Sequence, residues 1–153
     1  MKKFEPKKIL VPVDFSEFSQ DALRAAAEIA ELRHANLTVM HVMMEPQASV
    51  PYEVYIDWQK VKDEIKVDAE KLLREMAGKA GFNGNGMTER VLVWGEPAKV
   101  ITDAAQNENF DLLVMATHGR TGLPRLFLGS IAEKVIRHAP CPVLVMRGAV
   151  SEE

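Results

Sequence analysis

The sequence predicts an α/β fold, in which an open, mostly parallel sheet is covered by helices on both faces. Short apolar runs rich in branched residues alternate along the chain with segments whose apolar residues recur at helical spacing. The runs are apolar on both faces, as in strands that lie between two layers of helices. Parallel strands need crossover connections, which the intervening helices supply. A length of 153 residues without internal repeats predicts a single domain over residues 1–153.

Five runs have the length and composition of strands, and the first two read as buried. They lie at residues 9–13, 37–43, 88–94, 111–117 and 142–146. Two further segments lack a regular pattern. Residues from about 43 to 56 contain Pro46 and Pro51 and are predicted to form an irregular insertion, while residues 147–153 form a polar tail.

A helix is predicted between each pair of consecutive strands. Ser16 and Ser19 are both possible N-caps of the first helix, and Asp57 can cap a long second helix. Pro97 suits the first turn of the third helix. The second helix has an apolar face that is predicted to point inward. Its members are Val61, Ile65, Ala69, Leu72, Leu73 and Met76.

The composition excludes several classes of protein. Apolar residues make up 47% of the chain and charged residues 27%, which is the balance of a soluble globular protein. No apolar run approaches the roughly 18 residues of a membrane helix, and the apolar stretch after the basic N-terminus is too short for a signal peptide. A lone cysteine rules out an internal disulfide, and a net charge of -3 does not point to nucleic acid. We therefore expect a cytoplasmic protein without a membrane or nucleic-acid partner.

The strongest functional signal is the stretch MATHGRTGLPRLFLGSIAEKVI, residues 115–136. Ser130 followed by Glu133 fits a capping box, so the last helix is predicted to begin at Ser130. The first N–H groups of a helix lack partners inside it, and together with the helix dipole they form an anion site. Gly119 and Gly129 have no Cβ, so a phosphate can approach the backbone closely at both positions.

Polar side chains around this loop can add contacts to a phosphate. The Ser130 hydroxyl can cap the helix or donate to a phosphate oxygen, and Arg120 and Arg125 can add positive charge. His118 lies at the mouth of the same site. The alternative interpretation is ordinary turn chemistry, because glycines and a serine often precede a helix.

Asp14, at the carboxyl end of the first strand, also has two interpretations. Its carboxylate can accept hydrogen bonds from ribose hydroxyls, or it can brace the turn at Ser16. The commoner phosphate-binding motifs, G-x-x-x-x-G-K-[ST] and a G-x-G-x-x-G after the first strand, do not occur in the sequence. His41 and His118 sit in no nucleophile–base pattern, and His41 in mid-strand is expected to be structural. The protein is therefore not expected to be an enzyme.

Three stretches together resemble the universal stress protein family. They are ILVPVDFSEFSQDAL, LTVMHV and ATHGRTGLPRLFLGSIAEKVIRHAPCPVLVMR. Nucleotide-binding members of that family have a glycine, two residues, a second glycine, nine residues and then Gly-Ser or Gly-Thr. Gly119 and Gly129-Ser130 fit this spacing, but Ala116 stands at the position of the first glycine. An alanine there can stay extended, whereas a left-handed conformation would be costly for it.

The resemblance implies a Rossmann-like fold of the adenine nucleotide alpha-hydrolase type, with five strands in the order 3-2-1-4-5. It also implies that the protein binds ATP, or ADP or AMP, and that Mg or Mn can accompany the phosphates. It assigns the phosphates to Gly119, Gly129, Ser130 and the Ile131 amide, the ribose to Asp14, the pocket wall to Pro12 and Val13, and the adenine edge to the backbone of Val42.

The function that the resemblance implies is a role in stress response, as a signalling or protective protein that acts through nucleotide occupancy. Two alternatives stay open. One is an interaction module of the same fold that binds no nucleotide, which Ala116 favours, and the other is a slow ATPase. In the implied strand order the last strand lies at a sheet edge, and a bare apolar edge invites pairing. The resemblance likewise implies a homodimer, through Val143, Leu144 and Val145.

Overall fold

The computed structural model describes residues 4–45, 55–81, 86–92, 94–118 and 128–147. They form a five-stranded sheet in the order β3-β2-β1-β4-β5, in which all neighbouring strands are parallel. The strands are β1 (Lys8–Pro12), β2 (Asn36–Val42), β3 (Thr88–Leu92), β4 (Leu112–Ala116) and β5 (Val143–Met146). The parallel sheet and the strand order expected from the sequence are both confirmed.

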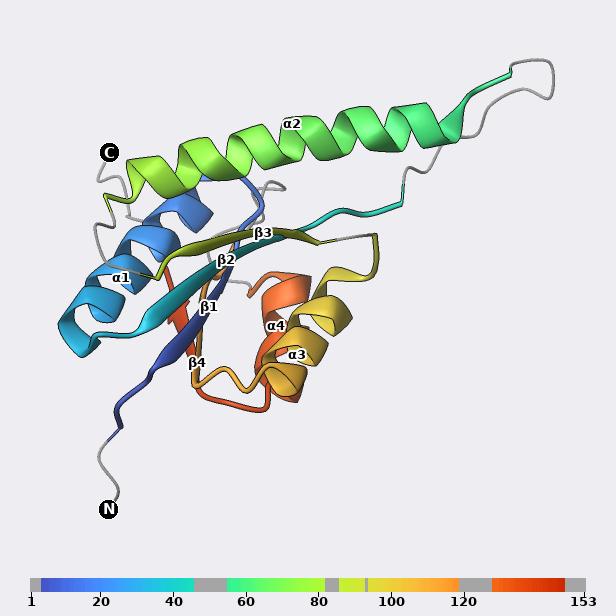
Figure 1. The fold of residues 1–153 in the computed structure, drawn as a ribbon. Coiled ribbons are helices and arrows are strands. Elements are labelled where there is room, and N and C mark those ends of the chain that lie inside the picture. The colour runs from blue at the N-terminus through green and yellow to red at the C-terminus, as the bar shows by residue number, and fades with distance from the viewer. Residues whose placement is uncertain (1–3, 46–54, 82–85, 93, 119–127, 148–153) are drawn as a thin grey trace, which may run out of the picture.

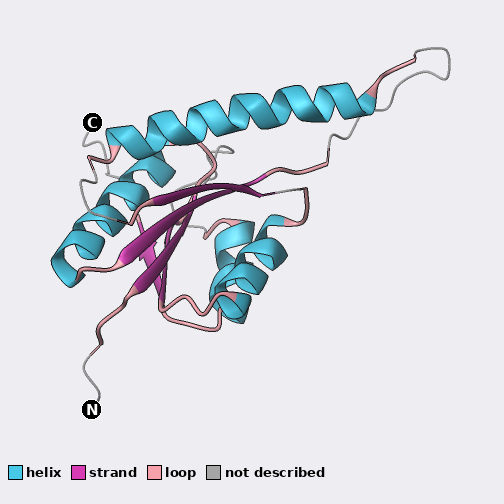
Figure 2. Ribbon diagram, viewed as in Figure 1, coloured by secondary structure: helices cyan, strands magenta, loops and turns pink. Residues whose placement is uncertain are grey.

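The helices of the described residues lie between the strands in sequence. They are α1 (Glu17–Arg33), α2 (Trp58–Lys79), α3 (Pro97–Asn107) and α4 (Ser130–His138). Figure 1 shows α1 and α2 over one face of the sheet and α3 and α4 over the other, and Figure 2 shows the same layers coloured by secondary structure. The sheet is therefore sandwiched between two helical layers, as the apolar character of both strand faces predicts.

Two apolar clusters, one on each face of the sheet, hold the layers together. Successive residues of a strand point to opposite faces. Ile9 and Val11 of β1 accordingly pack with α1 and α2, whereas Leu10 packs with α3 and α4. All three side chains are fully buried, and each such burial contributes about 1.5–3 kcal/mol. The central strand is therefore apolar at the positions that both layers cover, Ile9, Leu10 and Val11.

Polar side chains fix where α1 and α2 begin. Ser16 is the N-cap of α1, and its hydroxyl oxygen accepts the Ser19 N–H at 3.2 Å. Asp57 is the N-cap of α2 and accepts the Lys60 N–H at 3.1 Å. Ser19 is buried instead and donates its hydroxyl to the Ser16 carbonyl at 3.0 Å. Of the two possible caps of the first helix, Ser16 is therefore the one used.

The inward face predicted for α2 is wrong in part. Ala69, Leu73 and Met76 are buried as expected, but Ile65 is 38% exposed and Leu72 is 42% exposed. Figure 1 shows that the N-terminal part of α2 extends beyond the ends of the strands that it covers. Helical spacing identifies the apolar face of a helix, but it does not indicate how far the sheet reaches beneath that face.

Candidate functional site

The carboxyl ends of β1 and β4 lie on neighbouring strands in the middle of the sheet. The chain leaves β1 through α1 on one face and reaches β4 through α3 on the other, so the winding direction reverses between these strands. Ligands of open α/β sheets bind outside the carboxyl ends of the strands at such a point. β1 pairs with β4 over two residue pairs, at Ile9 and Leu10, against five pairs with β2. The two strands are therefore tied together at their amino-terminal halves.

The turn after β1 is held by hydrogen bonds around Asp14. Its Oδ1 accepts the Ser16 N–H at 3.0 Å and the Ser16 hydroxyl at 2.5 Å. The Val13 N–H donates to the Met40 carbonyl at 2.7 Å and so ties the turn to β2. Asp14 thus braces the turn at Ser16, which is one of the two roles that its position suggests. Its contact with a ribose stays a prediction.

His41 reaches the same turn from β2. Its Nδ1 lies 2.8 Å from the Val13 carbonyl oxygen, and because a carbonyl only accepts, Nδ1 is the donor. The imidazole ring also packs on Phe15, with centroids 4.2 Å apart and a tilt of 34°. Phe15 has a left-handed backbone with φ of 65°, which is uncommon for a bulky residue. The contacts of His41 agree with the structural role expected from its place in the strand.

Helix α4 begins at Ser130, as predicted from the sequence, but its N-cap differs from the prediction. Gly129 is the N-cap, and Ser130 is the first helical residue. The Glu133 N–H donates to the Gly129 carbonyl at 2.9 Å, and no side chain of the described residues caps this helix. The predicted capping box of Ser130 and Glu133 is therefore wrong, although the helix covers the predicted residues. Ser130 is exposed, so its hydroxyl lies at the surface of the first turn.

Gly129 also touches the end of β4. Its N–H donates to the Thr117 carbonyl at 2.8 Å, and a Cβ built on Gly129 would lie 2.9 Å from the same oxygen. That separation is shorter than the van der Waals contact of about 3.5 Å or more between non-bonded heavy atoms. A glycine at this position thus allows the N-terminus of α4 to lie against the carboxyl end of β4.

Ala116 is the last residue of β4 and has the extended backbone of a strand. The family pattern has a glycine at this position, and alanine would be unfavourable there only if the backbone were left-handed. Because Ala116 is extended, that cost does not arise. The departure from the family pattern therefore leaves the backbone at the end of β4 unstrained.

His118 follows β4 and carries a polar atom without a partner. Its Nδ1 lies 2.8 Å from the Thr117 hydroxyl oxygen, and its ring packs near Phe18 of α1 at 6.1 Å between centroids. Its Nε2 is inaccessible to solvent and has no hydrogen-bond partner within the described part of the chain. Buried polar atoms normally have such a partner. His118 thus presents unused hydrogen-bonding capacity at the end of β4.

The structure gathers most of the predicted site residues at this edge of the sheet. Pro12, Val13, Asp14, Ala116 and His118 lie at the ends of β1 and β4, and Gly129, Ser130 and Ile131 lie at the start of α4. Val42 ends β2, on the other side of β1. Gly119, Arg120 and Arg125 lie outside the described residues. The contribution of Thr117 was not predicted, because it comes from a backbone carbonyl that no side-chain pattern signals.

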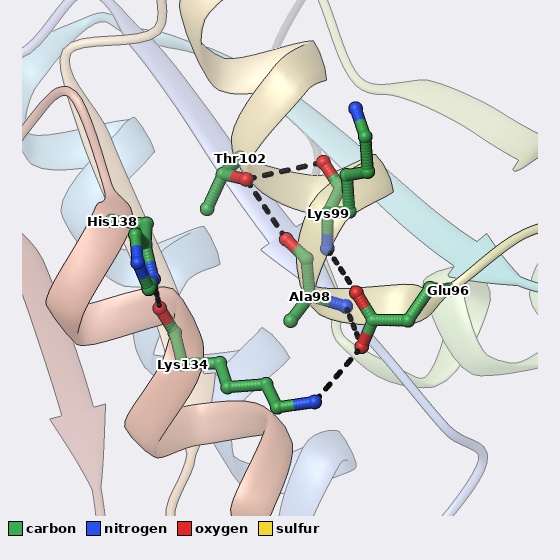
Figure 3. A network of polar contacts seen from close by, with 6 residues as sticks. All are labelled: Glu96, Ala98, Lys99, Thr102, Lys134 and His138. Carbon is green, nitrogen blue, oxygen red and sulfur yellow. Dashed lines mark hydrogen bonds and ion pairs between the residues drawn. The ribbon is translucent and has the colours of Figure 1, made fainter.

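A concave surface of about 550 Å³ lies away from this edge, between α3 and α4. Figure 3 shows that its polar groups contact one another. The Glu96 carboxylate accepts the N–H groups of Ala98 and Lys99 at the start of α3 and lies 3.7 Å from Lys134 Nζ of α4. The hydrogen bond from the Lys99 amide is the main reason why the pKa of Glu96 lies below its usual range. These groups cap α3 and link the two helices, and they form no concentration of one charge.

Other kinds of site find no support in the described residues. They contain no group of three or more histidine, cysteine, aspartate or glutamate side chains that could hold a metal ion. None of their helices has the length and apolar character needed to cross a membrane. Burial, followed by the Asp111 carboxylate, raises the pKa of the Cys141 thiol. A protonated thiol is a poor nucleophile, so this shift disfavours reaction at Cys141.

Known proteins resemble this chain over nearly its whole length. The model of the universal stress protein family matches residues 5–147. A universal stress protein of Methanocaldococcus jannaschii, MJ0531, is 35% identical over 142 residues, which are 92% of this chain and 82% of that protein. The solved universal stress protein UspA from Lactobacillus plantarum is 28% identical, with a TM-score of 0.78 over 96% of this chain and 100% of that one.

A further similar structure was solved with a bound ligand. It is the universal stress protein from Archaeoglobus fulgidus in complex with dAMP, which is 27% identical to this chain. Its TM-score is 0.68, over 91% of this chain and 96% of that one. The family match over nearly the whole chain and the identity to MJ0531 lead to one conclusion. The chain belongs to the universal stress protein family.

Proposed function

We propose that this protein binds an adenine nucleotide, with ATP as its preferred ligand, at the carboxyl ends of β1 and β4. The start of α4 carries the proposal. Gly129 caps this helix, and no side chain of the described residues accepts its first N–H groups. A phosphate is the kind of acceptor that such a helix start favours. The dAMP complex of the Archaeoglobus fulgidus relative supports an adenine nucleotide as the ligand.

The phosphates would lie against the first turn of α4. The N–H groups of Ser130 and Ile131 would donate to them, and the exposed Ser130 hydroxyl would add a further hydrogen bond. His118 Nε2, which is buried and unpartnered within the described residues, is a candidate for one more contact. ATP offers more phosphate oxygens than AMP, so we expect ATP to bind more tightly. A divalent ion such as Mg or Mn would then be held mainly by the phosphates.

The nucleoside would extend from the phosphates across β1 toward β2. Asp14 stands at the end of β1, where its carboxylate would accept hydrogen bonds from the ribose hydroxyls. Pro12 and Val13 would form the wall of the pocket, and the backbone of Val42 at the end of β2 would contact the adenine edge. This order of contacts follows the order of the strands, β4-β1-β2, in the sheet.

We further propose that the protein acts through nucleotide occupancy and not through rapid hydrolysis. The sequence has no nucleophile–base motif, and His41 is engaged with the Val13 carbonyl. Efficient phosphoryl transfer needs a group that positions or activates the attacking water. Occupancy would then set the affinity of the protein for a partner in stress signalling or protection. The same-fold interaction module without nucleotide is the alternative, and the extended backbone of Ala116 gives it no added support.

Native mass spectrometry tests the proposed ligand. The protein is purified without added nucleotide and measured before and after addition of ATP. We expect one adenine nucleotide per chain, either retained from the cell or bound on addition, and released on denaturation. Bare chains in both samples would contradict nucleotide binding and favour the interaction module.

A further inference from the structure

The turn between β1 and α1 has an unusual backbone at the residue after Asp14. Phe15 is left-handed, with φ of 65°, although this conformation normally favours glycine, asparagine or aspartate. Such backbone strain persists only where neighbouring contacts fix it, and it is frequent at functional sites. The Asp14 carboxylate lies directly beside this strained residue and is bonded forward to Ser16. Its position therefore depends on what keeps the turn in this shape.

His41 contacts the turn on both sides of Asp14. Its Nδ1 donates to the carbonyl of Val13, the residue before Asp14, at 2.8 Å. Its ring packs on Phe15, the residue after Asp14, at 4.2 Å between centroids. His41 belongs to β2, and the Met40 carbonyl beside it accepts the Val13 N–H at 2.7 Å. One imidazole thus links the sheet to both neighbours of Asp14.

We propose that His41 is a positioning residue for ribose recognition, because it fixes the turn that presents the Asp14 carboxylate. The proposal rests on the proposed function, in which Asp14 accepts the ribose hydroxyls. It makes His41 responsible for selecting nucleotides that carry these hydroxyls, without contact between His41 and the ligand. His41 would thus act on one part of the nucleotide only, whereas a merely structural histidine would affect the whole ligand.

Calorimetric titration with ATP and with 2′,3′-dideoxy-ATP separates these roles. The two ligands differ only in the ribose hydroxyls, so the ratio of their dissociation constants measures ribose recognition. We expect the wild type to bind ATP about tenfold or more tightly, as for a hydrogen bond to a charged group. Asp14→Ala removes the acceptor and should bring the ratio close to one.

Three histidine variants then test the positioning role. His41→Phe keeps an aromatic ring beside Phe15 but has no donor for the Val13 carbonyl, so the ratio should fall toward one while dideoxy-ATP binds as before. His41→Asn restores an N–H near the place of Nδ1 and should recover most of the ratio. His138→Phe is the matched control. His138 Nδ1 also lies 2.8 Å from a backbone carbonyl, that of Lys134, but in α4, and its replacement should leave the ratio unchanged.

The outcomes distinguish failure of nucleotide binding from failure of the positioning role of His41. A wild type that binds neither ligand would overturn both the proposed function and the role of His41. If the wild type prefers ATP and Asp14→Ala loses the preference, but His41→Phe retains it, only the role of His41 is wrong. Equal weakening of both ligands in His41→Phe would also contradict positioning, because it is the result of a general structural role. An Asp14→Ala variant with an unchanged ratio would remove the basis of the proposal.

Discussion

The backbone N–H of Gly129 donates a hydrogen bond of 2.8 Å to the carbonyl of Thr117. This bond joins the N-terminus of α4 directly to the carboxyl end of β4. It places the first helical N–H groups at the carboxyl end of β4, the strand next to β1, which leads into the turn that carries Asp14. The candidate phosphate site is therefore fixed by a backbone contact to the strand that neighbours the candidate ribose site.

Gly129→Ala should weaken ATP binding at least tenfold. The added Cβ would meet the Thr117 oxygen at 2.9 Å, so the start of α4 must move away from β4, at a cost of about 1–3 kcal/mol in stability. Gly78→Ala in α2 is the matched control, because no described atom outside its own helix lies within 4 Å of that Cβ. It should keep the affinity and raise stability by up to about 1 kcal/mol. Calorimetry and thermal melting measure both effects, and equal affinities in the two variants would contradict the prediction.

Ser16→Ala and Ser130→Ala should separate capping from ligand binding. Ser16 caps α1, so its replacement should cost about 1 kcal/mol, or a few degrees in melting temperature. Ser130 is the first residue of α4 and not its cap, so Ser130→Ala should leave the melting temperature almost unchanged. It should still weaken ATP binding, because a hydroxyl is lost from the phosphate site. A melting temperature lowered equally by both changes would instead support the capping box at Ser130.

Glu108 should make stability depend on pH. Arg90 of β3 donates two hydrogen bonds to the Glu108 carboxylate, one of them at 2.9 Å, and these lower the pKa of Glu108. The contribution of Glu108 to the free energy of unfolding is therefore complete at pH values above its unfolded-state pKa of about 4.3. It is lost as the pH falls through the lower pKa of the folded state. Both side chains are about a third exposed, so solvent screening limits the contribution to about 1 kcal/mol.

Thermal melting of the wild type and of Glu108→Gln between pH 7 and pH 3 tests whether Glu108 makes stability depend on pH. The variant should be less stable near pH 7, and the difference should shrink at pH 3. The control is Asp103→Asn, which removes a more exposed pair with Lys99 and should change the stability little at either pH. A difference between wild type and Glu108→Gln that stays constant over this range would exclude the linkage.

The homodimer through β5 is a further prediction. The hydrogen bonds between β4 and β5 show which residue of β5 should be substituted to test it. The Leu113 N–H donates to the Pro142 carbonyl and the Thr117 N–H to the Met146 carbonyl, both at 3.0 Å. In a parallel ladder alternate residues bond to one side, so Leu144 points its backbone groups toward β4. Val143 and Val145 then point theirs to the open edge. Val145→Pro would remove a donor from that edge and spare the bonds to β4.

Light scattering at micromolar concentration should give the wild type about twice the mass of the 17.1 kDa chain. Val145→Pro should stay folded and become monomeric, because proline is tolerated where the N–H faces an open edge. Leu144→Pro should instead lower the melting temperature, because it removes a bond within the sheet. A monomeric wild type, or a fully dimeric Val145→Pro, would refute assembly through this edge.

The sheet and most helix starts could be predicted because their signals are local. Strands that are apolar on both faces, such as the one around Leu10, belong in a parallel sheet, and Ser16 and Asp57 occupy the cap positions that their side chains favour. The start of α4 was predicted correctly, but its cap was assigned to Ser130. Gly129 is the N-cap instead, and its N–H donates to the carbonyl of Thr117, which lies 12 residues earlier in the sequence. No local pattern records such a bond.

The details of the β1 turn depend on similarly distant contacts. Bulky residues such as Phe15 normally avoid a left-handed backbone. A phenylalanine in the sequence therefore does not indicate the left-handed conformation that Phe15 adopts. The brace from His41 comes from another strand, 28 residues from Val13. Along α2, spacing placed Ala69, Leu73 and Met76 correctly in the core. It also predicted an inward position for Ile65 and Leu72, which are exposed, because spacing alone does not show how far neighbouring layers cover a helix.

Calorimetric titration of the wild type with ATP, AMP and adenosine tests the central claim most directly, since the three ligands share the nucleoside and differ in phosphate. If the phosphates bind at the start of α4, ATP should bind most tightly, AMP less tightly and adenosine at least tenfold more weakly than ATP. The titrations are run with magnesium or manganese present. Absence of binding by ATP at millimolar concentration, or equal affinities for ATP and adenosine, would contradict a nucleotide site built on Gly129 and the N-terminus of α4.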